Sequence, residues 1–190
     1  MNERDGDKMA MKKNPSVSFN KESRFPTVDG ASFVDDAASV IGDVKIGRGV
    51  YVAPLVSVRA DEGTPIVIGD GSNLQDGVII HALENTSVEI GKRVSIAHGA
   101  VIHGPTTVGD NSFVGFRAVV HGSKIGSGSF VGHGAIVVGV TVANKQYVPH
   151  GKVVTTQKEA DELSAVPGDL EGFNDEVLKV NGELAGGYGA

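Results

Sequence analysis

The stretch that decides the fold is IGKRVSIAHGAVIHGPTTVGDNSFVGFRAVVHG, residues 90–122. Within it an aliphatic residue returns at every sixth position, namely Ile90, Ile96, Ile102, Val108, Val114 and Val120. An amphipathic helix would repeat its apolar residues every 3.6 positions, and the strands of a hairpin would alternate them over longer runs. The six-residue period fits neither pattern and predicts a chain wound in short strands around a triangular prism.

The same period extends beyond this stretch, from Val40 to Val154, and glycine follows many of the aliphatic residues. Three hexads make one coil, in which the aliphatic residue points inward and its neighbour points outward. We therefore expect an all-β solenoid, a parallel β-helix of hexapeptide repeats. The known folds built from such repeats are left-handed, so we expect that hand, although the general crossover rule favours the right hand.

The two ends of the chain do not follow the repeat. Residues 1–24 are polar, and we expect a flexible N-terminal arm there. The β-helix is expected over residues 25–155, and residues 156–190 are expected to form C-terminal helices that pack on it. This organisation predicts one repetitive domain with appended ends.

The C-terminal segment carries two helix-start signals. Thr156 and Glu159 have the spacing of a capping box, in which each residue satisfies a backbone N–H near the other. The stretch NDEVLKVNGELA, residues 174–185, predicts a second helix with Asn174 as its N-cap. Such helices could cover an edge or the last coil of the solenoid.

Composition excludes several classes of function. The formal net charge is −6 and no long basic stripe occurs, so a nucleic-acid partner is not expected. The chain has no cysteine, which excludes disulfides and thiolate metal sites. No apolar run is long enough to span a membrane. The N-terminal segment has no apolar signal region, so a cytoplasmic location is expected, with a secreted mature form left open.

Two departures from the period fall at the same corner of consecutive coils. The steps from Val58 to Ile68 and from Ile80 to Ile90 are each ten residues long, so each contains a four-residue insertion. The insertions place Glu62 and Glu84 in stacked loops. Paired carboxylates beside a reaction centre can relay protons, although two acids in solvated loops would also satisfy the pattern.

The register of the coils places histidines above one another. On one face, the outward residue after each core position belongs to a single column, made of Arg59, His81, His103 and His121. His81 and His103 then stand one strand spacing apart, roughly 4.8 Å. Two imidazoles at that separation can bind one metal ion.

His98 belongs to a column on a different face, with Asp76 one coil below it. It could join His81 and His103 only if it came from a neighbouring molecule, as in a cyclic trimer of prisms. The same arrangement would bring Arg59 of one chain to Asp76 of the next, a pairing of opposite charges that arginine favours.

At this point the residues resemble a known family. The segments VRADEGTPIVIGDGSNLQDGVIIHALE (58–84) and SIAHGAVIHGP (95–105) are similar to the gamma-class carbonic anhydrases. The Arg-x-Asp-Glu, Asn-x-Gln-Asp and three-histidine elements occur in the family's order and spacing, and the resemblance runs from about Val28 to the C-terminal helices. It implies that His81, His98 and His103 are the metal ligands, with His98 supplied by the neighbouring chain.

The resemblance also implies roles for other polar residues. Gln75 matches the residue that hydrogen-bonds the metal-bound water, and Asn73 the residue that orients this region. Glu62 matches the proton acceptor near the metal, and Glu84 the shuttle to buffer. Asn181 matches a residue near the substrate pocket. The intersubunit ion-pair set is matched by Arg59, Asp61 and Asp76.

The function implied is the reversible hydration of CO2 to bicarbonate and a proton, by metal-bound hydroxide at a site shared between the subunits of a homotrimer. One divalent metal per interface is expected, zinc or iron(II), with cobalt as a substitute. Two positions depart from the family: only the short stretch ENTS (84–87) stands where a long acidic loop is found, and Lys179 replaces a tyrosine.

Two other functions remain open at the level of the sequence. Hexapeptide-repeat acyltransferases share this type of fold, and His121 would be the candidate general base in that case. A non-catalytic scaffold related to the gamma-class enzymes is the other alternative, although such relatives typically lose metal ligands. All three histidines are present here.

Overall fold

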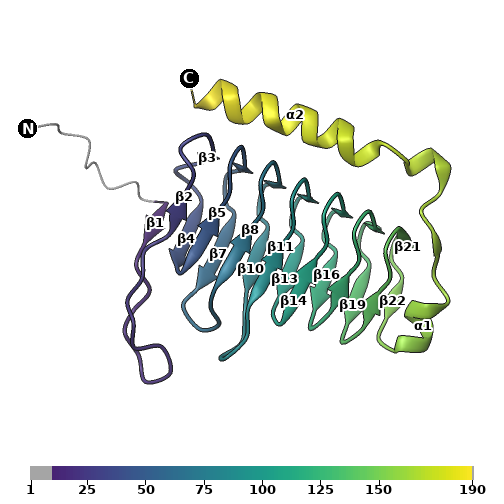
Figure 1. Cartoon of the computed structure of the whole chain (residues 1–190), viewed down its shortest axis with the longest axis horizontal. Coiled ribbons are helices and arrows are strands. Elements are labelled where there is room, and N and C mark those ends of the chain that lie inside the picture. Colours follow the sequence, from purple (N-terminus) through teal and green to yellow (C-terminus); the bar gives the residue numbers. More distant parts are fainter. Residues whose placement is uncertain (1–9, 190) are drawn as a thin grey trace, which may run out of the picture.

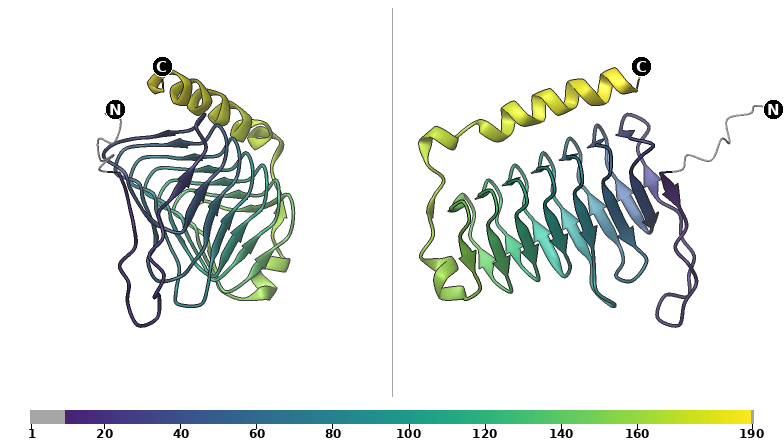
Figure 2. Two further views of the ribbon diagram at one scale, coloured as in Figure 1. Left: turned by 60° about the vertical axis from the view of Figure 1, so that its left-hand side comes forward. Right: turned by 180° about the vertical axis from the view of Figure 1, so that it is seen from behind.

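Each hexad forms one short strand, and the chain turns a corner before the next strand begins. The computed structural model describes residues 10–189. Consecutive strands of the coils belong to three different sheets, so that the strands from Met11–Lys12 to Val153–Val154 pair in parallel with strands one coil away (Figure 1), and only the short strand Ser164–Ala165 within the described residues pairs antiparallel, with Gln146–Val148. The turned views show the coils stacked along one axis (Figure 2). The predicted parallel β-helix is confirmed.

The three sheets form the three walls of the prism. Sheet A contains β1 (Met11–Lys12), β4 (Ser39–Gly42), β7 (Ser57–Ala60), β10 (Ile79–His81), β13 (Val101–His103), β16 (Val119–His121), β19 (Ile136–Val138) and β22 (Val153–Val154). Sheet B contains β2 (Thr27–Val28), β5 (Val44–Ile46), β8 (Ile66–Ile68), β11 (Val88–Ile90), β14 (Thr106–Val108), β17 (Lys124–Ile125) and β20 (Thr141–Val142). Sheet C contains β3 (Phe33–Val34), β6 (Tyr51–Val52), β9 (Asn73–Leu74), β12 (Ser95–Ile96), β15 (Phe113–Val114), β18 (Phe130–Val131), β21 (Gln146–Val148) and β23 (Ser164–Ala165).

The aliphatic residues of the repeat fill the prism. Ile80, Ile96, Ile102 and Val120 have no exposed surface. The register pairs Ile80 with Ile102, and Ile102 with Val120, as the six-residue period predicts. Strands of two to four residues are too short to be stable alone, so stability comes from stacking each coil on its neighbours.

Close stacking also explains why glycine follows many core residues. A Cβ atom at Gly69 would lie 2.5 Å from the backbone carbonyl of Gly91 in the next coil. Only a residue without a side chain allows the coils to approach this closely.

The predicted flexible arm is wrong for residues 10–24. Met11 pairs with Val40, which makes β1 the first strand of sheet A. The loop that follows is held by the buried side chain of Asn14, whose Nδ2 donates to the carbonyl of Glu22 (2.9 Å) and whose Oδ1 accepts from the backbone N–H of Arg24 (2.7 Å). The fold therefore starts before residue 25, and residues 1–9 lie outside the described part of the chain.

The first C-terminal helix is α1 (Gln157–Asp161), and its predicted capping box is confirmed. The Thr156 side chain accepts from the backbone N–H of Glu159, and the Glu159 side chain accepts from the backbone N–H of Thr156. A short 3₁₀ turn, η1 (Gly168–Leu170), follows β23.

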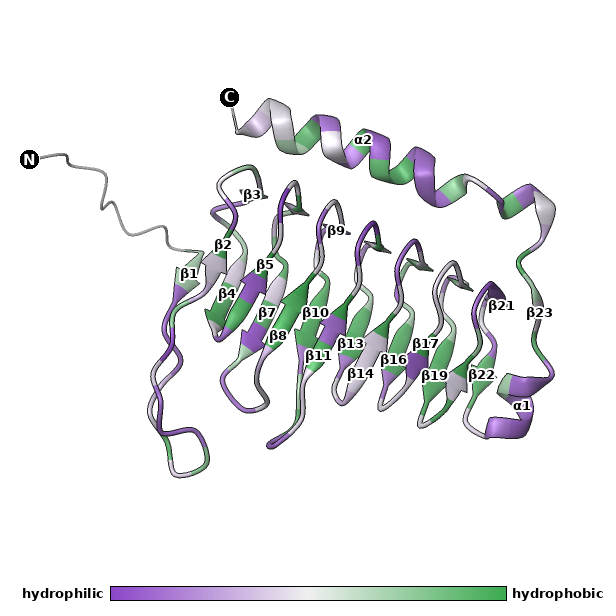
Figure 3. Ribbon diagram, viewed as in Figure 1, coloured by the Kyte–Doolittle hydropathy of each residue, from purple (hydrophilic) through white to green (hydrophobic). Residues whose placement is uncertain are grey.

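The second C-terminal helix is α2 (Phe173–Tyr188), which runs back along the prism against sheet C (Figure 1). Polar and apolar residues alternate along it (Figure 3), and Leu178 and Ala185 are buried. Near its end the ring of Tyr188 stacks on Phe33, with centroids 5.2 Å apart. Within residues 10–189 no helix is both long and apolar enough to cross a membrane.

The prediction that Asn174 caps α2 is wrong. Gly172 occupies the N-cap in a left-handed conformation, with φ of 81°, and supplies no side-chain cap. Asn174 lies in the first turn and its Nδ2 donates to the carbonyl of Arg93 (3.0 Å). A hydrogen bond to Arg93, which is distant in the sequence, thus takes the place of the local capping hydrogen bond.

Two stacked histidines near the C-terminal end make stability depend on pH. The backbone N–H of Phe116 donates to Nδ1 of His133 (3.0 Å), and the backbone N–H of His133 donates to Nδ1 of His150 (2.8 Å). Both rings must be neutral at Nδ1 to accept these bonds. Burial lowers the pKa of His133 below its ordinary value, and the neighbouring His150 lowers it further.

We expect the metal-free protein to lose stability as the pH falls below about 6.5, because the unfolded chain then binds a proton that folded His133 resists. The measurement is urea denaturation at pH 7.5 and pH 5. The matched variant is His133→Asn, since Asn144 already accepts the N–H of Ser127 (2.9 Å) at another corner. It should lose less stability than the wild type over this range, and an equal loss would contradict the assignment.

Candidate metal site

His81 and His103 are brought side by side by the register of sheet A. β10 and β13 are adjacent parallel strands, and His81 pairs directly with His103. Nδ1 of His81 lies 3.3 Å from Nε2 of His103. Two ligand nitrogens on one tetrahedral metal, with bonds of roughly 2.0–2.1 Å, are about 3.3–3.4 Å apart. The observed separation therefore fits a shared metal ion.

The neighbouring backbone sets the orientation of the His103 ring. Nδ1 of His103 lies 3.1 Å from the carbonyl oxygen of Gly104, which can only accept a hydrogen bond. The proton is therefore placed on Nδ1, and Nε2 keeps its lone pair on the side facing His81.

Carboxylates surround His81. Asp61 Oδ1 lies 3.1 Å and Glu62 Oε2 lies 3.9 Å from Nε2 of His81. Arg59, directly below His81 in the column, pairs with Asp61 within the same chain (3.1 Å). The expected set of charged residues is thus present beside the histidines, with two of its members already paired within one chain.

The two insertion loops stack as the sequence predicts. The backbone N–H of Glu84 donates to Oε1 of Glu62 (3.0 Å), and the N–H of Gly63 donates to the carbonyl of Ala82 (3.0 Å). Glu62 is therefore fixed between His81 and the second loop, while Glu84 lies farther out and is exposed.

His98 lies on another part of the prism. It follows β12 of sheet C, and its side chain is 55% exposed. Asp76 lies beneath it, with Oδ2 3.0 Å from Nδ1 of His98, and Phe116 lies above it, with ring centroids 5.5 Å apart. In residues 10–189, no three or more His, Cys, Asp or Glu side chains of one chain gather closely enough to hold a metal.

Gln75 and Asn73 form a buried hydrogen-bonded relay on the same side as His98. Nε2 of Gln75 donates to Oδ1 of Asn73 (3.1 Å), and Nδ2 of Asn73 donates to Oγ of Ser95 (2.8 Å). All three side chains are buried. The sequence did not single out Ser95, because an isolated serine in a strand gives no signal until its neighbour across the sheet is known.

A pocket of about 320 Å³ joins this relay to α2. The polar residues Gln75, His98, Glu176 and Asn181 line it, together with the apolar side chains Phe113, Phe116, Phe173, Val177 and Val180. Asn181 donates from Nδ2 to the carbonyl of Val177 (2.8 Å). The structure thus brings three of the predicted site residues into one pocket, whereas Lys179 is exposed to solvent and does not line it.

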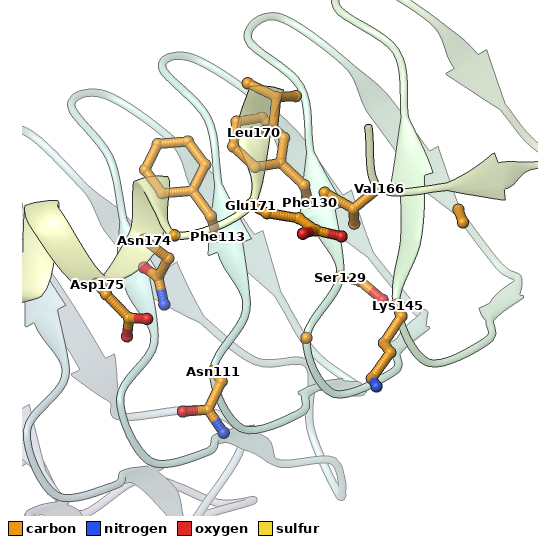
Figure 4. A pocket seen from close by; sticks show the side chains of 13 residues that line it. Asn111, Phe113, Ser129, Phe130, Lys145, Val166, Leu170, Glu171, Asn174 and Asp175 are labelled. Atoms are coloured by element: carbon orange, nitrogen blue, oxygen red, sulfur yellow. The ribbon is translucent and has the colours of Figure 1, made fainter. Parts of the chain in front are cut away.

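A second pocket, of about 430 Å³, lies beside the segment that precedes α2 (Figure 4). Phe113 and Phe130 form its apolar floor, and Lys145 and Glu171 stand at its rim. None of the predicted catalytic or metal-ligating residues lines it. The predicted site residues therefore lie at the pocket lined by Gln75 and His98 and on the His81 side of the prism.

Comparison with known proteins decides the family. No protein-family model matches the chain. It is, however, 41% identical to the carbonic anhydrase of Methanosarcina thermophila, across 94% of this chain and 81% of that protein. This chain belongs to the gamma-class carbonic anhydrase family.

Other relatives of this chain differ in what they are named for. The carboxysome assembly protein CcmM of a Nostoc species is 41% identical over 184 residues, which cover 92% of this chain but only 33% of that protein. A hexapeptide transferase family protein from Anaplasma phagocytophilum has the same fold, with a TM-score of 0.76 and 25% identity over 87% of this chain and 93% of the other.

Proposed function

We propose that this protein hydrates CO2 reversibly to bicarbonate and a proton at a divalent-metal site shared between the subunits of a homotrimer. The observation that carries the proposal is the 3.3 Å separation of the His81 and His103 nitrogens, which suits two ligands of one tetrahedral metal. Family membership supports the reaction.

The chain carries two complementary halves of such a site. One half contains His81 and His103 on sheet A, and the other contains His98 and Gln75 after strands of sheet C. A second copy that docks its sheet C corner on sheet A would join the halves, and a ring of three copies would close. Ile79 beside the first half and Phe116 beside the second are each more than 40% exposed in the single chain, and this docking would cover both.

The donor set fits zinc, iron(II) or cobalt(II), all of which accept neutral imidazoles. His81, His98 and His103 would hold the metal. When bound to three imidazoles, such a metal lowers the pKa of a water to about 7, which makes hydroxide available at neutral pH. The apolar side chains next to His98 suit CO2, which has no net dipole and is poorly hydrated.

The polar residues of the chain would orient the reacting water and remove its proton. Gln75 is held by Asn73, so its amide reaches the pocket in a fixed direction. Glu62 is close enough to His81 to accept a proton at the site, and the exposed Glu84 is next to Glu62 and can release it to buffer. The short loop after Glu84 restricts how far that carboxylate travels.

The test is CO2 hydration by stopped flow, with metal-free protein reconstituted under anoxic conditions with zinc, iron(II) or cobalt(II). We expect turnover that depends on the added metal and rises to saturation at one metal per chain. A folded, metal-loaded trimer that does not accelerate hydration with any of the three metals would overturn the proposal.

The fold shared with a hexapeptide transferase family protein keeps acyl transfer as a second candidate. His121 lies one strand above His103, with ring centroids 5.2 Å apart, and would be its general base. Acetyl-coenzyme A should then raise the melting temperature, and His121→Ala should abolish acetyl transfer. A scaffold role, as the name of CcmM suggests for that protein, would instead leave a metal-loaded trimer without turnover.

A further inference from the structure

One face of α2 lines the pocket that contains His98 and Gln75. The helix packs against β9 and β12 of sheet C. Five of its residues line the pocket at the spacing of a single helix face, namely Phe173, Glu176, Val177, Val180 and Asn181. Four of these side chains are apolar or carry an uncharged amide. Glu176 is the exception, because it places a carboxylate at a position where the spacing favours an apolar residue.

The Glu176 carboxylate does not hold the fold together. Its neighbour Asp175 pairs with Arg93, whereas the Glu176 side chain makes no hydrogen bond or ion pair within residues 10–189, including with Lys179 one turn further along α2. The backbone N–H of Glu176 donates to the carbonyl of Gly172 (3.2 Å), so its place in the first turn is fixed. The side chain is exposed to solvent. It can therefore exchange protons with buffer.

Water in the pocket can connect Glu176 to the site. The pocket of about 320 Å³ has room for about ten water molecules, at roughly 30 Å³ each. Gln75 and His98 line it on the side of the sheet, and Glu176 lines it on the side of the helix. Among the described residues that line it, His98 and Glu176 are the only titratable ones. A proton released at the site thus has a path that does not pass through the Glu62 and Glu84 loops.

We propose that Glu176 is a second proton-release residue of the reaction. This inference rests on the proposed function. The carboxylate accepts one proton from the water in the pocket and donates one proton to a buffer base, so the residue returns unchanged. In the shared site, Glu176 belongs to the chain that supplies His98, whereas Glu62 and Glu84 belong to the neighbour that supplies His81. Each chain then provides one exit, and Glu176 compensates for the short loop that restricts Glu84.

The first experiment separates proton release from hydration. In stopped-flow kinetics of the metal-loaded trimer, kcat/KM covers the steps up to the loss of bicarbonate, and kcat includes proton release to buffer. We expect Glu176→Gln to lower kcat about twofold at low buffer concentration, as for one of two comparable parallel routes. Its kcat/KM should not change, and a high concentration of imidazole buffer should restore kcat. If kcat and kcat/KM fall together, the residue acts on hydration or metal binding, and the proposal is overturned.

The matched control is Glu183→Gln, which removes an exposed carboxylate from the same helix without touching the pocket. It should leave both kinetic constants unchanged. The double variant Glu84→Gln/Glu176→Gln tests whether the two exits are parallel. We expect it to lose more than about tenfold in kcat, well beyond the roughly fourfold product of two twofold losses, because no carboxylate exit remains. A loss no greater than that product would contradict parallel exits.

The second experiment does not depend on turnover. The visible spectrum of the cobalt(II)-loaded protein is followed against pH. Loss of the negative charge at Glu176 should lower the pH at which the spectrum changes, because a nearby negative charge opposes ionisation of a water on the metal. Glu183→Gln should leave that pH unchanged. The other charged residues near the shared site, Arg59, Asp61 and Glu62 of the neighbouring chain, are the same in both variants.

The outcomes separate this inference from the proposed function. A metal-loaded wild type that does not hydrate CO2 overturns the proposed function, and the proton-release role with it. A wild type that does hydrate CO2, while Glu176→Gln changes neither kcat nor the cobalt spectrum, overturns the role of Glu176 alone.

Discussion

Replacing His103 with alanine is expected to remove the metal and to lower CO2 hydration by about 10³-fold or more, equivalent to at least about 4 kcal/mol of transition-state stabilisation. The reason is geometric. His103 supplies one of the two nitrogens that lie 3.3 Å apart, and alanine has no atom that can bind a metal at that point. Metal content by mass spectrometry and stopped-flow hydration are the measurements.

The fold should survive this change, because His103 points outward while Ile102 beside it remains fully buried. The matched control is His121→Ala. His121 occupies the next position of the same column and lies 5.2 Å from His103 between ring centroids, but it is not among the predicted ligands. This control should retain metal and most activity. A His103→Ala protein that is metal-free and fully active would refute the site.

Mixing two inactive variants is expected to restore activity. His98→Ala and His103→Ala should each be inactive as homotrimers, because every interface lacks one ligand. In trimers reassembled from equal amounts of both, an interface is intact when a His98→Ala chain supplies His81 and His103 and the neighbouring chain supplies His98. Random assembly makes about one interface in four intact, so about a quarter of the wild-type activity should return.

The measurement is stopped-flow hydration after joint unfolding and refolding of the two variants, with each variant refolded alone as the control. Simple mixing of preformed trimers should stay inactive until subunits exchange. If the mixed trimers remain inactive, the three histidines do not meet between chains, and a site contained within one subunit would have to be sought.

The sequence determined the β-helix architecture of this protein and which outward side chains stack above one another from coil to coil. A six-residue period constrains the chain at every coil, because each core position must be aliphatic and each close approach of the coils must be glycine. His81 and His103 could therefore be placed side by side before any coordinates were known, and the structure pairs them in register. The capping box at Thr156 is equally local, since both partners lie within four residues.

Only the tertiary structure decided which partner each polar group takes. The sequence predicted a flexible arm that included residues 10–24, but β1 pairs with β4, and the Asn14 side chain accepts a hydrogen bond across the loop that follows β1. The sequence predicted Asn174 as the N-cap of a helix, but its side-chain amide donates to the carbonyl of Arg93, in a corner next to sheet C. Both outcomes depend on residues distant in the sequence that folding brings within hydrogen-bond reach.

The same distinction applies at the site. The period placed Asp76 under His98, and the tertiary structure decided which atoms approach, with Oδ2 of Asp76 3.0 Å from Nδ1 of His98. A repeat fixes where a side chain stands, because sterics act identically at every coil. It does not fix how that side chain bonds, because hydrogen bonds depend on distances of a few tenths of an ångström between atoms that only the folded chain positions.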